Sequence, residues 1–150
     1  MDIIGEIIPH SSKQHNFILT ATYYFTKWVE EIPLKVANSD NIIEFIDQFI
    51  ITRFGLPNAL IFDNASYFLG NSMTQFALKR GFKLKYSANY NPQGNSLAES
   101  TNKNLIRIIK CIVDQSQKNW HKYLVFALWD DRITMKASIR TTPFNLDFGK

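Results

Sequence analysis

The first quarter of the chain consists of short apolar runs separated by polar breaks, a pattern typical of β-strands. Residues 3–8 form one apolar run, residues 17–25 are rich in β-branched and aromatic side chains, and residues 28–36 alternate apolar with polar positions. The connection after Thr22 is short. We therefore predict three strands that pair as an antiparallel meander.

Beyond residue 38 the apolar positions recur mainly every three or four residues, which indicates helices. The first helix predicted there is capped by Ser39 or Asp40 and ended by residues 54–57. A strand over 58–62, a helix over 72–79 and a strand over 82–86 follow it. The rest is predicted to be a loop over 87–96, helices over 97–113 and 120–134, and an irregular tail over 141–149. The strand–helix–strand order in the middle predicts a βαβ unit.

Composition fits one folded domain of the mixed α/β class. The chain has 150 residues, of which 45% are hydrophobic, enough to bury a core. No apolar run is long enough to cross a membrane, and we expect no secretion signal. The single cysteine, Cys111, lies in an apolar helical pattern, where we expect a core position or a dimer interface. It is compatible with a reducing nuclear or cytoplasmic compartment.

Positive charge is concentrated in one stretch. The formal net charge is only +4. Between Lys79 and Lys110, however, there are seven basic residues and a single acid, Glu99. Such a stretch suits a polyanionic partner. An ordinary solvated lysine face explains it equally well when charge alone is considered.

Three carboxylates stand where a divalent metal site would need them. Asp63 ends an apolar strand, Glu99 opens a helix after thirty-five intervening residues, and Asp2 lies in another apolar run. Carboxylates that converge from strand ends and a helix can hold Mg²⁺ for phosphoryl transfer. Taken singly, each residue has a simpler interpretation: a terminal residue, a turn, or an acid complementing a helix dipole.

The sequence around these carboxylates resembles the catalytic core of retroviral-type integrases, most closely those of gypsy-class LTR retrotransposons of plants. The matching runs are Phe25-Thr26-Lys27-Trp28-Val29-Glu30, Arg53-Phe54-Gly55-Leu56-Pro57, Asp63-Asn64, Tyr90-Asn91-Pro92-Gln93 and Ala98-Glu99-Ser100-Thr101-Asn102-Lys103. Residues 128–129, 132–134 and 142–144 also look like the end of that core. The resemblance covers residues 1–149.

This resemblance implies a ribonuclease H-like fold, with a mixed five-stranded sheet of three antiparallel and two parallel strands flanked by helices. It implies a DNA strand transferase that uses Mg²⁺ or Mn²⁺, with Asp2, Asp63 and Glu99 as catalytic and metal-binding triad. Its partners would be retroelement ends, a target duplex, and a second copy bound through core helices. The DNA-binding candidates are Lys103, Arg107, Lys110, Asn91, Gln93 and Asn64.

The chain departs from the family pattern in several places. Glycine is usual where Ala65, Ser96 and Arg140 stand, and a left-handed backbone there would cost on the order of 1–2 kcal/mol each. We expect an isolated core, residues 1–150, with neither a zinc domain nor a C-terminal DNA-binding domain. Two alternatives therefore stay open: a non-catalytic nucleic-acid-binding or dimerisation module, and a ribonuclease H acting on RNA–DNA hybrids.

Overall fold

Three antiparallel strands form the centre of the structure, a computed structural model that describes residues 1–62, 66–87 and 92–149, with the backbone alone over 92–102. Strands β1 (Asp2–Gly5), β2 (Phe17–Thr22) and β3 (Val29–Leu34) lie in that order. The predicted meander is therefore confirmed. Each strand is shorter than its apolar run, because Pro9 and the turn after Thr22 leave the ladder.

The helical segment after β3 is continuous but changes its winding. It comprises α1 (Ser39–Phe45), the π-helical turn η1 (Ile46–Ile51) and α2 (Thr52–Phe54). The predicted cap was wrong by one residue, because the side chain of Asn38 accepts the hydrogen bond from the Asn41 N–H at 2.9 Å. Gly55 ends the helix with φ of 83°, a backbone angle that favours glycine.

The predicted βαβ unit is present. Strands β4 (Ala59–Phe62) and β5 (Lys83–Tyr86) pair in parallel and are joined by the 3₁₀ turn η2 (Ser66–Phe68) and α3 (Asn71–Arg80). They form a second, two-stranded sheet instead of continuing the first ladder. A hydrogen bond from the Met1 nitrogen to the Ile61 carbonyl oxygen, at 2.5 Å, joins the start of the first sheet to the second.

The C-terminal half is helical: α4 (Pro92–Ser116), the 3₁₀ turn η3 (Gln117–Asn119), α5 (Trp120–Ile133) and α6 (Pro143–Phe148). Two predictions were wrong here. The expected loop is helical from Pro92 onward, since proline is well tolerated in a first helical turn. The expected irregular tail contains α6, which Thr142 caps by accepting a hydrogen bond from the Asn145 N–H.

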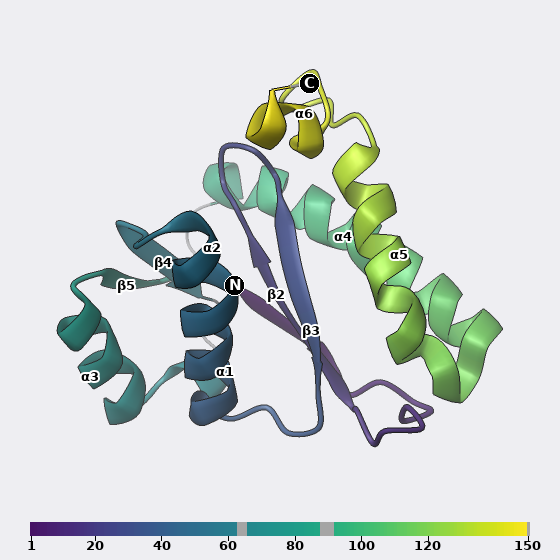
Figure 1. Ribbon diagram of the computed structural model, residues 1–150, viewed down its shortest axis with the longest axis horizontal. Coiled ribbons are helices and arrows are strands. Elements are labelled where there is room, and N and C mark those ends of the chain that lie inside the picture. Colours follow the sequence, from purple (N-terminus) through teal and green to yellow (C-terminus); the bar gives the residue numbers. More distant parts are fainter. Residues whose placement is uncertain (63–65, 88–91, 150) are drawn as a thin grey trace.

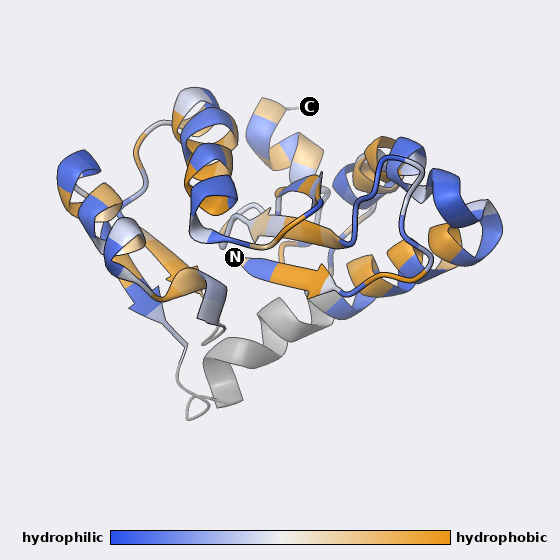
Figure 2. Cartoon of the chain, turned by 90° about the horizontal axis from the view of Figure 1, so that it is seen from below, coloured by the Kyte–Doolittle hydropathy of each residue, from blue (hydrophilic) through white to orange (hydrophobic). Residues whose placement is uncertain are grey.

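Helices cover both faces of the three-stranded sheet (Figure 1). On one face Leu19 and Leu34 pack with Phe45 of α1 and with β4, β5 and α3. On the other, Ile18 and Val29 pack against α4 and α5. The alternation of side chains along β2 separates these two cores. Figure 2 shows β1 as an apolar strand beside the alternating apolar and polar turns of α4. Cys111, expected in the core or an interface, is exposed.

Candidate active site

Asp2 stands at the start of β1, on the face of the sheet that α4 and α5 cover. It is half-buried, and β-pairing sets it beside Thr20, which in turn pairs with Glu31 of β3. The Thr20 hydroxyl donates to the backbone carbonyl of Asp2 at 3.3 Å. Directly paired residues share a face, so these three side chains form one row across the sheet.

The end of β4 reaches the same place. The Met1–Ile61 hydrogen bond joins the residue before Asp2 to the third residue of β4. That strand ends at Phe62, and Asp63 follows it in the sequence. Asp63 and Asn64 themselves lie outside the described residues.

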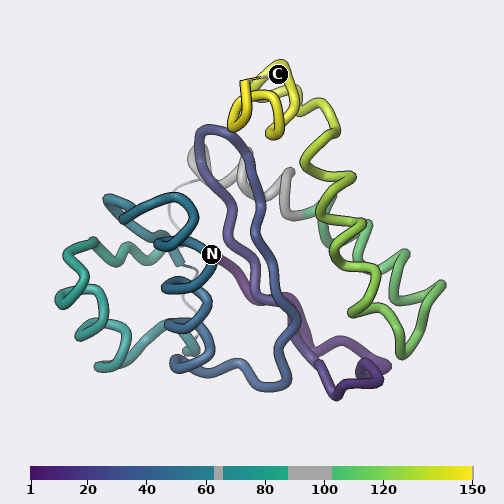
Figure 3. The backbone as a smooth tube through the Cα atoms, in the orientation of Figure 1, coloured from purple at the N-terminus to yellow at the C-terminus, as the bar shows by residue number. Residues whose placement is uncertain are grey.

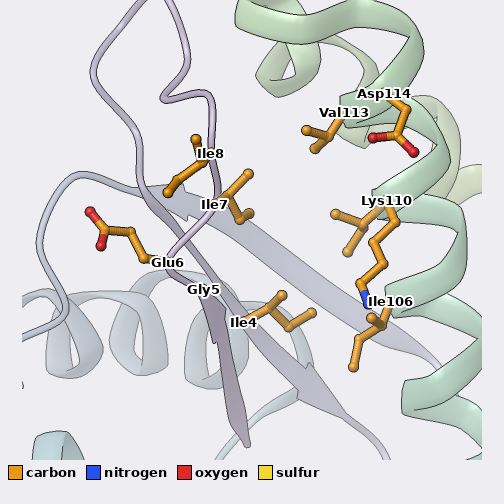
Figure 4. A pocket seen from close by; sticks show the side chains of 10 residues that line it. Ile4, Gly5, Glu6, Ile7, Ile8, Ile106, Lys110, Val113 and Asp114 are labelled. Carbon is orange, nitrogen blue, oxygen red and sulfur yellow. The ribbon is translucent and has the colours of Figure 1, made fainter.

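Helix α4 runs in the same direction as β1. A groove of about 430 Å³ separates them, lined at one end by Ile4 and Ile106 and at the other by Ile8 and Asp114 (Figure 4). Stepping back two residues from Ile4 to Asp2 covers about 7 Å of strand. Stepping back seven residues along the helix covers about 10 Å and reaches Glu99. The backbone of Glu99 is thus level with Asp2 to within a few ångströms, although its side chain lies outside the description.

The remaining DNA-binding candidates divide between described and undescribed residues. Lys103, Arg107 and Lys110 are exposed along α4, and none forms an ion pair with a described side chain. They are thus available to an anionic partner. Gln93 is in the first turn of α4 without a described side chain, and Asn91 lies outside the described residues.

The carboxylate oxygens of the three candidate residues are ligands that suit a hard divalent cation. Among residues whose side chains are described, no group of three metal-ligating side chains is found. The predicted triad includes two carboxylates whose side chains lie beyond that description, so it stays a prediction. The Met1–Ile61 hydrogen bond joins the start of β1 to β4, and α4 runs alongside β1 in the same direction. Carboxylates brought together from strand ends and a helix can share a Mg²⁺ or Mn²⁺. Asp2, Asp63 and Glu99 are the residues that would hold the ion.

A buried carboxyl, which the sequence analysis missed, continues the row from Asp2. Glu31 is only 8% exposed, and neither of its carboxylate oxygens has a hydrogen-bond partner among the described residues. Burial, the largest cause, and the charge of Asp131 on α5 together raise its pKa to about 8, although the charge of Arg132 opposes the shift. The signal in the sequence was the pair Glu30-Glu31. Successive residues of a strand point to opposite faces of the sheet, so both glutamates are buried when both faces are covered.

Comparisons with known proteins bear on the fold and on ancestry. No protein-family model matches the chain. It is similar to the catalytic core domain of bovine immunodeficiency virus integrase, with a TM-score of 0.71 at 19% identity over 91% of this chain and 87% of that one. It is also similar to a chain of the simian T-cell lymphotropic virus intasome, solved in complex with the PP2A regulatory subunit B56 gamma, with a TM-score of 0.73 at 19% identity over 88% of this chain and 48% of that one. The chain has the fold of a retroviral integrase core.

Curated relatives are retrotransposon polyproteins. The Tf2-3 and Tf2-4 transposon polyproteins of Schizosaccharomyces pombe are each 26% identical to the chain over 147 residues. The match covers 97% of this chain but 11% of each polyprotein. The similarity to these transposon polyproteins thus extends along almost the whole chain. The likeness to the solved integrase core confirms the ribonuclease H-like α/β fold expected from the sequence. No helix in the described part of the chain is long and apolar enough to cross a membrane.

Proposed function

We propose that this chain is the catalytic core of a retrotransposon integrase, a polynucleotidyl transferase that cuts and joins DNA. The observation that supports the proposal is the parallel course of β1 and α4 along one groove, together with the hydrogen bond from β4 to the residue before Asp2. Similarity to the Tf2 polyproteins over 97% of the chain supports it. We further propose that the parent element is of the gypsy class, as in plants, and that the protein acts in the nucleus or cytoplasm.

The proposed chemistry is two successive displacements at phosphorus. In the first, a water oxygen bonds to the phosphorus of a phosphodiester near the element's end, and the bond to the 3′ oxygen breaks. In the second, the freed 3′ hydroxyl bonds to a phosphorus of the target duplex and displaces another 3′ oxygen. In each step the attacking oxygen loses its proton to solvent and the displaced oxygen takes one up.

Each candidate residue has a part in this scheme. A divalent ion, Mg²⁺ or Mn²⁺, would supply charge stabilisation at the attacking and leaving oxygens. Asp2, Asp63 and Glu99 would hold it. Lys103, Arg107 and Lys110 would bind phosphates along α4, and Asn64, Asn91 and Gln93 would contact the DNA near the reacting bond. We propose a second copy of the chain, bound through the core helices, as a further partner.

Disintegration of a branched DNA by the purified chain tests the proposal. We expect product only with Mg²⁺ or Mn²⁺, and none from Asp63→Asn/Glu99→Gln, which should still bind the substrate in fluorescence anisotropy. Activity that survives the double substitution would refute the triad. DNA binding without turnover or magnesium binding would instead favour the non-catalytic module, and cleavage restricted to RNA–DNA hybrids would favour a ribonuclease H.

A further inference from the structure

The loop between β1 and β2 is fixed to the turn between α4 and α5, far from Asp2. The backbone N–H of Ser12 donates to the Lys118 carbonyl at 2.6 Å. The Trp120 indole N–H donates to the Pro9 carbonyl at 3.0 Å. In Figure 3 the purple loop lies against the green turn that opens α5. Two segments more than a hundred residues apart thus form one surface.

Two histidines meet where these segments join. The rings of His15 and His121 are 5.4 Å apart between centroids, edge to face. Nδ1 of His15 is paired with the Ser11 hydroxyl at 2.9 Å. Neither ring nitrogen of His121 makes a hydrogen bond of ordinary geometry with a described residue. The pair is therefore not held together by a hydrogen bond or by a shared acid.

Among the described residues, the charged groups that shift the pKa of either histidine are cationic. Burial lowers the pKa of His15, and His121, Lys35 and Lys13 lower it further. Burial likewise lowers the pKa of His121, with Lys13 and Lys122 adding to the effect and the Lys118 carbonyl opposing it. A metal ion would meet the same repulsion as a proton. An anion would be attracted.

The lysines around the pair have no counter-ion among the described residues. Lys13, Lys35, Lys118 and Lys122 are exposed and form no ion pair there. The nearby acid Glu6 is paired with His10 at 3.3 Å. Uncompensated positive charge gathered from three segments indicates an anionic partner. We call these four lysines with His15 and His121 the lysine–histidine patch.

We propose that the lysine–histidine patch binds the phosphate backbone of duplex DNA at the end of α4 opposite the candidate active site. The inference rests on the proposed function, because it takes DNA as the substrate. Lys118 follows Glu99 by nineteen residues, about 28 Å of helix. One turn of duplex DNA is about 34 Å long. A duplex that leaves the site along α4 would therefore turn a phosphate backbone towards the patch nearly one helical turn away.

Charge-matched variants of the 150-residue chain test the patch. Lys13→Gln/Lys35→Gln/Lys122→Gln removes three of its charges, and Lys79→Gln/Lys83→Gln/Lys85→Gln removes three exposed charges from α3 and β5. Binding of a 30-base-pair duplex is measured by fluorescence anisotropy across a salt series. Loss of three phosphate contacts should reduce the magnitude of the slope of log K, the DNA-association constant, against log salt concentration by about 2.7, since each contact contributes about 0.9. The control should change the slope by less than half as much.

Two further arms make the result specific. Lys13→Arg/Lys35→Arg/Lys122→Arg keeps the charge and should bind like the wild type. His15→Gln/His121→Gln should remove part of the gain in affinity between pH 7.5 and pH 5.5, because bound phosphate favours protonation of the pair.

Three results would overturn the inference. An unchanged salt slope in the Lys→Gln patch variant, with wild-type DNA binding intact, refutes the patch and leaves the proposed function standing. Loss of binding to poly-glutamate but not to DNA assigns the patch to an acidic protein. Absence of DNA binding in the wild-type chain refutes the patch and the proposed function together.

Discussion

The Met1 nitrogen donates to the carbonyl oxygen of Ile61 at 2.5 Å, across sixty positions of sequence. This contact brings the residue before β1 to strand β4, which ends at Phe62. Helix α4 also runs in the same direction as β1. The proposed site takes Asp2 from β1, Asp63 from the sequence after β4 and Glu99 from α4. That arrangement makes the site testable residue by residue.

Asp2→Asn should abolish most of the metal-dependent activity. The substitution keeps the shape of the side chain but removes one anionic ligand, so strand transfer should fall on the order of 100-fold or more, as when electrostatic stabilisation of a developing charge is lost. Disintegration assays with Mg²⁺ measure the rate, and calorimetry measures magnesium affinity. Glu6→Gln, just beyond the same strand, is the control and should leave both unchanged. An Asp2→Asn protein with wild-type rate would remove Asp2 from the site.

Glu31 makes stability depend on pH. Its pKa is raised from 4.5 in the unfolded chain to about 8 in the folded protein, so the folded state holds the proton more tightly. This contribution is complete below about pH 4.5 and is lost as the pH rises through 8, at up to about 1.4 kcal/mol per pH unit. Neighbouring Asp131 strengthens the effect and Arg132 weakens it.

Glu31→Gln should therefore be more stable than the wild type at pH 8.5 and show a flatter dependence between pH 5 and pH 8. Urea unfolding across that range measures it. Glu44→Gln, at an exposed position of α1, serves as the control and should follow the wild-type curve. Parallel curves for wild type and Glu31→Gln would contradict the raised pKa.

Glu30 anchors a buried polar network. Its carboxylate accepts a hydrogen bond from the Trp28 indole N–H at 2.9 Å and pairs with Arg132 at 3.1 Å and Arg53 at 3.3 Å. Glu30→Ala would leave the largely buried Arg132 guanidinium without its anion. We expect a loss of about 3 kcal/mol or more in the free energy of unfolding, measured with urea. Glu44→Ala should cost less than about 0.5 kcal/mol; equal losses in the two variants would refute the network's role.

Arg140 has a left-handed backbone, with φ of 55°. This bears out the expectation of strain at one of the three positions where glycine is usual. Ser96 lies within α4, where a left-handed angle has no place, and Ala65 is outside the described residues. Arg140→Gly should stabilise the protein by about 0.5–1 kcal/mol. The backbone strain that it removes from the folded state costs more than the conformational entropy that glycine adds to the unfolded chain.

Thermal or urea unfolding measures that gain. Ser138→Gly, two residues away and without a positive φ, is the matched control and should destabilise the protein slightly. If both substitutions destabilise it, the strain at Arg140 is too small to matter.

Local periodicity predicted most elements but few of their ends. The 3.6-residue pattern located α3, α4 and α5, β-branched and aromatic content located β2, and alternation located β3. Helix α6 was missed because it has only six residues, although Thr142 followed by Pro143 is a start signal. The π-helical turn in α1–α2 has no signature in hydrophobic spacing.

The sequence by itself determined the three-stranded meander, the longer helices, the βαβ unit and the identity of the three carboxylates with their flanking runs. Tertiary structure alone decided that β1 and α4 run in the same direction, that Glu31 lies buried beside Asp131, and that Lys13 meets His121. Those relationships depend on packing between segments far apart in the chain. Hydrophobic periodicity indicates which face of a helix or strand is buried, but it does not indicate which distant element covers that face.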